Sequence, residues 1–181
     1  MTLFTGKGDN GKTTLFDSGE RISKTSCQMD VLGSLDEINT LLGVCKARAR
    51  NLDTKVRGVS VSDILEQLQQ DLFVIQAIIA GAPKEFTENR IKYLERNIEL
   101  IEKDLPEIKT FFLAGATELS GLLDYARAVS RRVERVLISF AEKEGLSAGI
   151  LQYTNRLSSI LYALVRFVNH KQGVEEVPPR Y

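Results

Sequence analysis

Three arginines spaced four residues apart, Arg127, Arg131 and Arg135, form the row of side chains best suited to chemistry in this sequence. An α-helix turns once in about 3.6 residues, so this spacing places three guanidinium groups along one side of a helix. Like charges at this spacing repel each other and weaken an isolated helix, and Glu134 offsets only part of the repulsion. The row is therefore either a solvated helix face or a surface on which an anionic ligand docks.

The glycine-rich segment at the start of the chain is a second candidate for anion binding. Residues 6–13 match the P-loop pattern G-x-x-x-x-G-K-[ST] letter for letter. A P-loop needs a buried strand before it and a helix after it, yet only Met1–Thr5 precede this match, and residues 14–20 contain Gly19 and poor helix formers. No alternation of strands and helices follows, so we do not interpret the chain as a P-loop NTPase.

The side chains of this segment still suit a polyphosphate. Glycines expose backbone N–H groups, which can wrap phosphate groups as an anion-binding nest. Hydroxyl groups and positive charge come from Thr5, Lys7, Lys12, Thr13 and Thr14. The alternative is a flexible N-terminus that carries lysines. Because the arginine row is a second anion binder, we favour a shared polyphosphate site, formed within one chain or across a subunit interface.

Composition excludes several other classes of site. The 181 residues are 43% hydrophobic with a formal net charge of +0, which fits one soluble domain without a global field for nucleic acid or membranes. His170 is the single histidine, which excludes a histidine-based triad and a multi-histidine metal site. Cys27 and Cys45 fit neither a disulfide framework nor a zinc knuckle. We see no signal-peptide pattern and no membrane span, and expect a cytoplasmic protein.

Apolar residues recur at intervals of three and four, which predicts amphipathic helices after the glycine-rich segment. The expected helices cover about 26–50, 63–80, 88–105, 117–144 and 148–171. Short connections favour an all-α fold, an antiparallel five-helix bundle with a glycine-rich N-terminal arm. We interpret the chain as a single domain, with the arm over residues 1–24, the bundle over 25–171 and a tail over 172–181.

Four motifs in order make the sequence similar to the PduO-type ATP:cob(I)alamin adenosyltransferases. The arm carries T-x-x-G-D-x-G-x-T at 5–13, followed by R-x-x-K at 21–24. The first expected helix carries G-x-x-D-E-[LI]-N at 33–39 and the fourth carries A-R-x-x-x-R-R-x-E-R at 126–135. The fifth carries N-R-L-S at 155–158. The motifs cover nearly the whole chain, although each one alone is a weak signal.

The resemblance implies an activity and an assembly. The expected enzyme transfers the 5′-deoxyadenosyl group of ATP to the cobalt of cob(I)alamin or a related corrinoid, releasing triphosphate and forming adenosylcobalamin. Mg²⁺ is expected to be held mainly by the ATP phosphates, without a protein metal site. The resemblance also implies a homotrimer with active sites between subunits. A corrinoid reductase and an adenosylcobalamin-dependent acceptor enzyme are the further partners, and nucleic acid and membrane are not.

The resemblance also assigns roles to residues that match the motifs. Arg127, paired with Asp36 to brace the site, and Arg131 are the expected catalytic residues. Phe111 is expected to face the corrinoid and displace its lower axial ligand. The expected ATP-binding residues are Thr5, Gly6, Lys7, Gly8, Thr13, Thr14, Lys24, Arg131, Arg132, Glu134, Arg135 and Asn155. In this chemistry the reduced cobalt is the nucleophile, so the protein needs no general base and orients and neutralises instead.

Some positions depart from the family pattern. The segment 113–116 reads LAGA where the family usually has L-P-G-G, Asp124 replaces a common histidine, and Ser159 follows N-R-L-S in place of aspartate. These departures motivate a second hypothesis, an ATP-binding corrinoid escort or regulator that has lost catalysis. A third hypothesis is a structural helical bundle whose arginine row binds an acidic partner.

Overall fold

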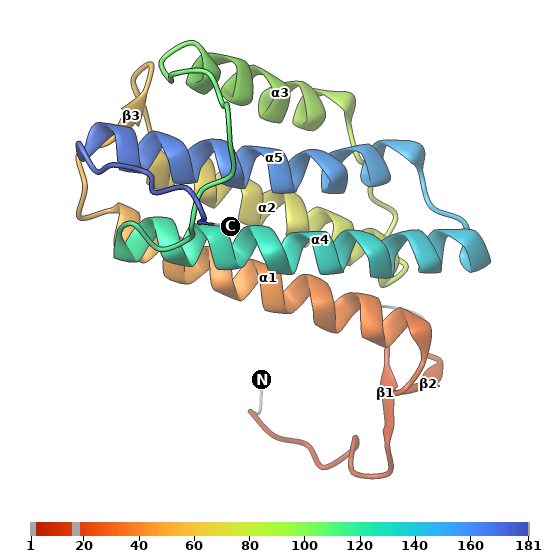
Figure 1. The fold of residues 1–181 in the computed structure, drawn as a ribbon. Helices are drawn as coiled ribbons and strands as arrows, with labels where there is room; N and C mark the ends of the chain where they lie inside the picture. The colour runs from red at the N-terminus through yellow and green to blue at the C-terminus, as the bar shows by residue number, and fades with distance from the viewer. Residues whose placement is uncertain (1–2, 16–18, 181) are drawn as a thin grey trace.

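The computed structural model describes residues 3–15 and 19–180 and confirms an all-α bundle with an N-terminal arm. Met1, Thr2, residues 16–18 and Tyr181, which fall in the predicted arm and tail, lie outside the described residues. The helices are α1 (Cys27–Ala49), α2 (Val61–Ile79), α3 (Glu88–Glu102), α4 (Glu118–Glu144) and α5 (Ala148–Lys171). The chain direction alternates from each helix to the next (Figure 1). All five predicted helices are present, with ends shifted by at most three residues.

Side-chain caps explain where the helices begin. Ser26 accepts a hydrogen bond from the N–H of Met29, and Ser60 accepts one from Asp63, which starts α2 two residues earlier than predicted. Thr117 and Ser120 form a reciprocal capping box at the start of α4. Each cap satisfies backbone N–H groups that have no partner inside the helix.

The core is formed by apolar stripes that face one another across the helices. α4 packs between α1 and α5, α2 packs against α1, and α3 packs against α5 at the edge of the bundle (Figure 1). Leu35 and Leu42 from α1, Leu68 from α2, and Leu157 and Leu164 from α5 are completely buried. Burying a side chain of this size stabilises the fold by about 1.5–3 kcal/mol relative to leaving it exposed. The interior therefore fixes the positions from which α4 and α5 present polar side chains.

The structure adds two antiparallel hairpins to the expected helices. β1 (Lys12–Thr14) pairs with β2 (Arg21–Ser23) in the arm, and β3 (Lys55–Val56) pairs with β4 (Val59–Ser60) between α1 and α2. The second hairpin lies between the first and second predicted helices, and its two turn residues, Arg57 and Gly58, have φ of 49° and 93°. Two positive φ values are typical of the tight turns that match the twist of a hairpin.

The arm extends from the N-terminus of α1, away from the helices (Figure 1). Arg21 holds it together, because its Nη2 donates to the carbonyl oxygens of Lys7 and Lys12, at 2.6 and 3.2 Å, and to Asn10 Oδ1 at 3.0 Å. The strand β1 occupies the position at which a P-loop would begin its helix. The glycine turn is thus followed by a hairpin and not by a helix, which agrees with the prediction that this segment is not a P-loop. Among the described residues, no helix is long and apolar enough to cross a membrane.

Candidate active site

The arginine row lies on the solvent side of α4. Ala126 and Val133 on the opposite side of the helix are buried in the core, and this burial fixes which side of α4 the arginines present. Arg131 and Arg135 are exposed and Arg127 is partly buried. A hollow of about 470 Å³ runs along the row. It is lined by Arg127, Ala128, Arg131, Arg132, Glu134, Arg135 and Ile138.

Two arginines of this surface are neutralised by carboxylates. Arg127 Nε donates to Asp124 Oδ1 at 3.0 Å, one turn earlier on α4. Arg132 Nη2 donates to Glu37 Oε2 on α1 at 2.6 Å. These two pairs hold their guanidinium groups in place and remove most of their free charge.

The other two arginines of this surface, Arg131 and Arg135, are not paired with a carboxylate of the described residues. In the described part of the chain, no hydrogen bond or ion pair is found for Arg131 or Arg135. Both line the same hollow, so two uncompensated guanidinium groups face one cavity. Guanidinium groups bind phosphate oxygens through charge-assisted, often bidentate hydrogen bonds. The geometry therefore suits an anionic ligand with several phosphate oxygens.

Helix α5 contributes polar side chains beside the row. Asn155 Nδ2 donates to Glu134 Oε1 at 2.7 Å, which joins two residues that the sequence had singled out on different helices. Arg156 Nη1 donates to Asn155 Oδ1 at 2.8 Å, and its Nε donates to Glu95 Oε1 at 3.2 Å. Arg156 was not among the predicted site residues. Its place directly after Asn155 in the N-R-L-S element was the available signal.

A second cavity, of about 770 Å³, opens between the start of α4, the end of α5 and the loop that precedes α4. Arg127 and Arg131 border this cavity as well as the hollow along the row. Its remaining lining combines aromatic, apolar and polar side chains: Ile108, Lys109, Thr110, Phe111, Phe112, Leu113, Ala114, Asp124, Ser158, Ser159, Tyr162, Val165, Asn169 and Glu176. The departures from the family pattern at Asp124 and Ser159 therefore lie at this cavity.

The aromatic residues of this cavity differ in how they are held. Phe111 is 79% exposed, so its ring is available to a ligand. Phe112 is partly buried, with the Arg166 guanidinium 5.6 Å from its ring centroid. The Arg127 guanidinium lies 5.8 Å from the ring centroid of Tyr162, and burial raises the pKa of the Tyr162 hydroxyl. A flat apolar ligand in this cavity would meet exposed and partly buried aromatic rings. These rings lie beside an arginine, Arg127, that an ion pair holds in place.

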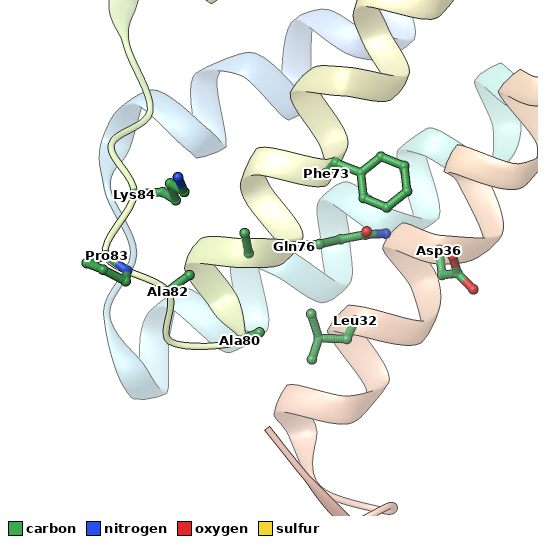
Figure 2. A pocket seen from close by; sticks show the side chains of 9 residues that line it. Leu32, Asp36, Phe73, Gln76, Ala80, Ala82, Pro83 and Lys84 are labelled. Atoms are coloured by element: carbon green, nitrogen blue, oxygen red, sulfur yellow. The ribbon is translucent and has the colours of Figure 1, made fainter. Parts of the chain in front are cut away.

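Asp36 lies on a different surface from Arg127 within one chain. Adjacent helical residues point about 100° apart, and while Glu37 faces α4, Asp36 borders a groove of about 620 Å³ between α1 and α2. Figure 2 shows Phe73 and Gln76 extending from α2 toward α1, where Asp36 sits at the rim of the groove. The expected pairing of Asp36 with Arg127 is not made inside the chain, because Arg127 pairs with Asp124.

The arm presents its predicted ligands to solvent. Thr5, Lys7, Thr14 and Lys24 are exposed, and Gly6 has a φ of 65° that favours glycine. The Lys24 side chain lies over the turn: a Cβ atom at Gly8, another predicted ATP-binding position, would be 2.9 Å from Lys24 Nζ. Thr13 is partly buried in β1. The absence of a side chain at Gly8 thus allows an ammonium group to approach the glycine turn.

Among the described residues, the base of the arm shares a cleft with the row. A cleft of about 840 Å³ between α1 and α4 has Thr25 on one side and Arg132 and Arg135 on the other. The hydrogen bonds found for residues 3–15 all join them to other arm residues. Within one chain, no hydrogen bond is found between residues 3–15 of the arm and the row.

Comparison with known proteins gives a family match over most of the chain. The family model described as cobalamin adenosyltransferase matches residues 3–168. The corrinoid adenosyltransferase PduO of Citrobacter freundii is 32% identical over 192 residues, covering 100% of this chain and 55% of that protein. The corrinoid adenosyltransferase of Bacillus subtilis (strain 168) is 31% identical over 181 residues, covering 98% of this chain and 91% of that protein. The chain thus spans about half the length of the first relative and most of the second.

Solved structures give the same result for the fold. A variant PduO-type ATP:corrinoid adenosyltransferase from Lactobacillus reuteri, complexed with cobalamin and ATP, superimposes with a TM-score of 0.88 at 27% identity. The match covers 99% of this chain and 100% of that one. Another variant from the same organism, complexed with ATP, gives a TM-score of 0.86 at 28% identity and covers 98% of this chain.

Proposed function

The chain belongs to the cobalamin adenosyltransferase family, and we propose that it transfers the 5′-deoxyadenosyl group of ATP to the cobalt of a reduced corrinoid, forming adenosylcobalamin and triphosphate. One observation carries the proposal beyond family membership. The uncompensated charge of Arg131 lies between the hollow along the row and the aromatic cavity, and borders both. A nucleoside triphosphate in the hollow and a flat corrinoid in the aromatic cavity would therefore both contact Arg131.

The reaction requires little proton chemistry from the protein. Cob(I)alamin is the nucleophile; its cobalt attacks the ribose C5′, the C5′–O bond breaks, and the electron pair leaves with triphosphate. The protein must hold the two substrates in line and neutralise the leaving group. Arg131 and Arg135 suit the second task, because their charges are not already used within the chain. Arg127, Tyr162 and Phe111 suit the first, since they line the aromatic cavity.

The donor set also bears on how magnesium would be bound. In the part of the chain that the structure describes, no group of three His, Cys, Asp or Glu residues is arranged to hold a metal ion. Near the row, Glu134 is engaged with Asn155 and Glu37 with Arg132. We propose that the ion is bound mainly by the phosphate oxygens of ATP and by water. Magnesium would supply further neutralisation of the triphosphate.

We assign the complete site to two copies of the chain in a homotrimer. The arm of one copy would close over the row of the next, and Asp36 of one copy would pair with Arg127 of its neighbour. The exposed apolar side chains support such a contact: Phe73 is 58% exposed beside Asp36, and Tyr125 is 57% exposed on the outer side of α4. A contact between two different faces repeats head to tail, and it gives a closed trimer when each step rotates the next copy by a third of a turn.

Anaerobic incubation with ATP and chemically reduced cobalamin, followed by corrinoid absorbance, tests the reaction. We expect the cob(I)alamin spectrum to convert to that of adenosylcobalamin with release of triphosphate. Tight ATP binding without any conversion would instead identify the escort or regulator, which the changed segment 113–116 at the edge of the aromatic cavity favours. A melting temperature that ATP does not raise would indicate the structural bundle.

The reaction also defines the partners and the compartment. Cobalt must arrive in its lowest oxidation state, which calls for a corrinoid reductase, and adenosylcobalamin must pass to an enzyme that uses it. The need for these partners and for ATP supports a cytoplasmic location, which we propose with them.

A further inference from the structure

The tail that follows α5 folds back onto the aromatic cavity. Gly173 has a φ of 64°, and the N–H of Val174 donates to the carbonyl oxygen of Asn169 at 3.0 Å, the pattern of a glycine-capped helix end. Beyond this turn, the carbonyl oxygen of Val177 accepts a hydrogen bond of 2.8 Å from the N–H of Leu113. Figure 1 shows the tail running beside the loop that links α3 to α4. The tail is thus attached to the loop that carries Phe111.

Glu176 anchors this tail to α5. Its Oε2 accepts from Arg166 Nε at 3.1 Å, and its Oε1 lies 3.4 Å from the donor Asn169 Nδ2. Arg166 is 5% exposed, and Glu176 is the one carboxylate paired with it among the described residues. A buried guanidinium needs such a partner, because an unpaired charge is costly to remove from water. Glu176 therefore satisfies a charge that the end of α5 cannot satisfy itself.

The same arginine connects the tail to the loop. Its guanidinium lies 5.6 Å from the ring centroid of Phe112, so Glu176, Arg166 and Phe112 form one continuous series of contacts. Glu176 and Asn169 line the same cavity of about 770 Å³ as Phe111 and Phe112. The loop is thus held at two points, by its backbone at Leu113 and by its side chain at Phe112.

We infer that the Glu176 side chain and the Val177 carbonyl group form a clasp that sets the position of the Phe111–Phe112 loop over the corrinoid, with Glu176 as its positioning residue. The inference rests on the proposed function, because it takes the aromatic cavity to be the corrinoid site. Glu176 acts through Arg166 and Phe112 and contributes nothing to the triphosphate side. Releasing the clasp should therefore weaken use of the corrinoid while leaving use of ATP unchanged.

The variant Glu176→Gln tests this split, because it removes the charge and keeps the shape of the side chain. We expect the KM for reduced cobalamin to rise about tenfold, with the KM for ATP changed by less than about twofold. Glu175→Gln is the matched control, since Glu175 is the exposed neighbour and no ion pair is found for it in the described chain. Glu176→Asp, which keeps the charge, should recover most of the loss. Equal changes in both KM values, or no change in either, would overturn the inference.

A second readout follows the loop itself and does not require turnover. The chain has no tryptophan, so Phe112→Trp introduces a single fluorescent reporter next to Arg166. In this background we expect Glu176→Gln to shift the emission to longer wavelength, as the indole becomes exposed, and Glu175→Gln to leave it unchanged. If the protein proves unable to adenosylate corrinoids, this fluorescence measurement still decides whether the clasp holds the loop. Identical emission in folded Glu176→Gln and its parent, with helical content checked by circular dichroism, would refute the clasp.

Discussion

Arg131→Ala removes a guanidinium group that no described residue of the chain engages. Because Arg131 is exposed and unpaired in the described structure, its loss should change the free energy of unfolding by less than about 0.5 kcal/mol. Its effect on catalysis should be far larger. Removing one preorganised donor that meets developing negative charge costs about 10²–10³ in rate, equivalent to about 2.7–4 kcal/mol. We therefore expect kcat/KM for ATP to fall by about two to three orders of magnitude while the fold remains intact.

The assay measures initial rates of adenosylcobalamin formation under anaerobic conditions, with ATP varied and cob(I)alamin in excess. Arg96→Ala is the matched control, because Arg96 is an exposed arginine on α3, a helix that packs against α5 at the edge of the bundle. The control should keep the kcat/KM of the unmodified protein, and both variants should unfold at its urea midpoint. If Arg131→Ala stays within about threefold of the unmodified protein, leaving-group neutralisation by this residue is refuted.

Three further perturbations separate the cavity, the core and the thiols. Phe111→Ala should raise the KM for the corrinoid about tenfold and leave the KM for ATP unchanged, since the ring is 79% exposed in the aromatic cavity; steady-state kinetics would show otherwise if both constants moved together. Asp71→Ala should lower the unfolding free energy in urea by about 3–5 kcal/mol, because Asp71 is fully buried and pairs with Arg90 and the Tyr153 hydroxyl; a loss below about 1 kcal/mol would contradict this. Burial raises the pKa of the Cys45 thiol from 9.0 to about 11. Because this thiol ionises first in the unfolded chain, the free energy of unfolding should decline from about pH 9 toward about pH 11. Urea titrations at each pH should show a smaller decline for Cys45→Ala.

Local signals in the sequence were sufficient for the helical framework. The three-and-four spacing of apolar residues predicted α1, α4 and α5 to within one residue at each end. The β3–β4 hairpin was not predicted, because its turn places Arg57 at a positive φ, and arginine is not a residue type that signals such a turn. Its short strands also lack an alternating pattern long enough to detect.

The candidate site was predictable where neighbours lie close in sequence or within a motif. Asp124 lies three residues before Arg127, the spacing of a helical ion pair, and this local signal indicates the partner that Arg127 has within the chain. The resemblance directed attention to Asp36 instead. The contact between Leu113 and Val177 could not be predicted, because it joins two irregular segments that only the packing of α4 on α5 brings together.

The central claim is that the arm of one copy and the arginine row of another bind the same triphosphate, and subunit mixing tests it most directly. Lys24→Ala disables the arm and Arg131→Ala disables the row, so each variant alone should be nearly inactive. Co-expressed in equal amounts in randomly mixed trimers, they should rebuild an intact arm–row pair at about one quarter of the sites, giving about a quarter of the unmodified activity. Activity that stays at the level of the separate variants would contradict a site shared between copies.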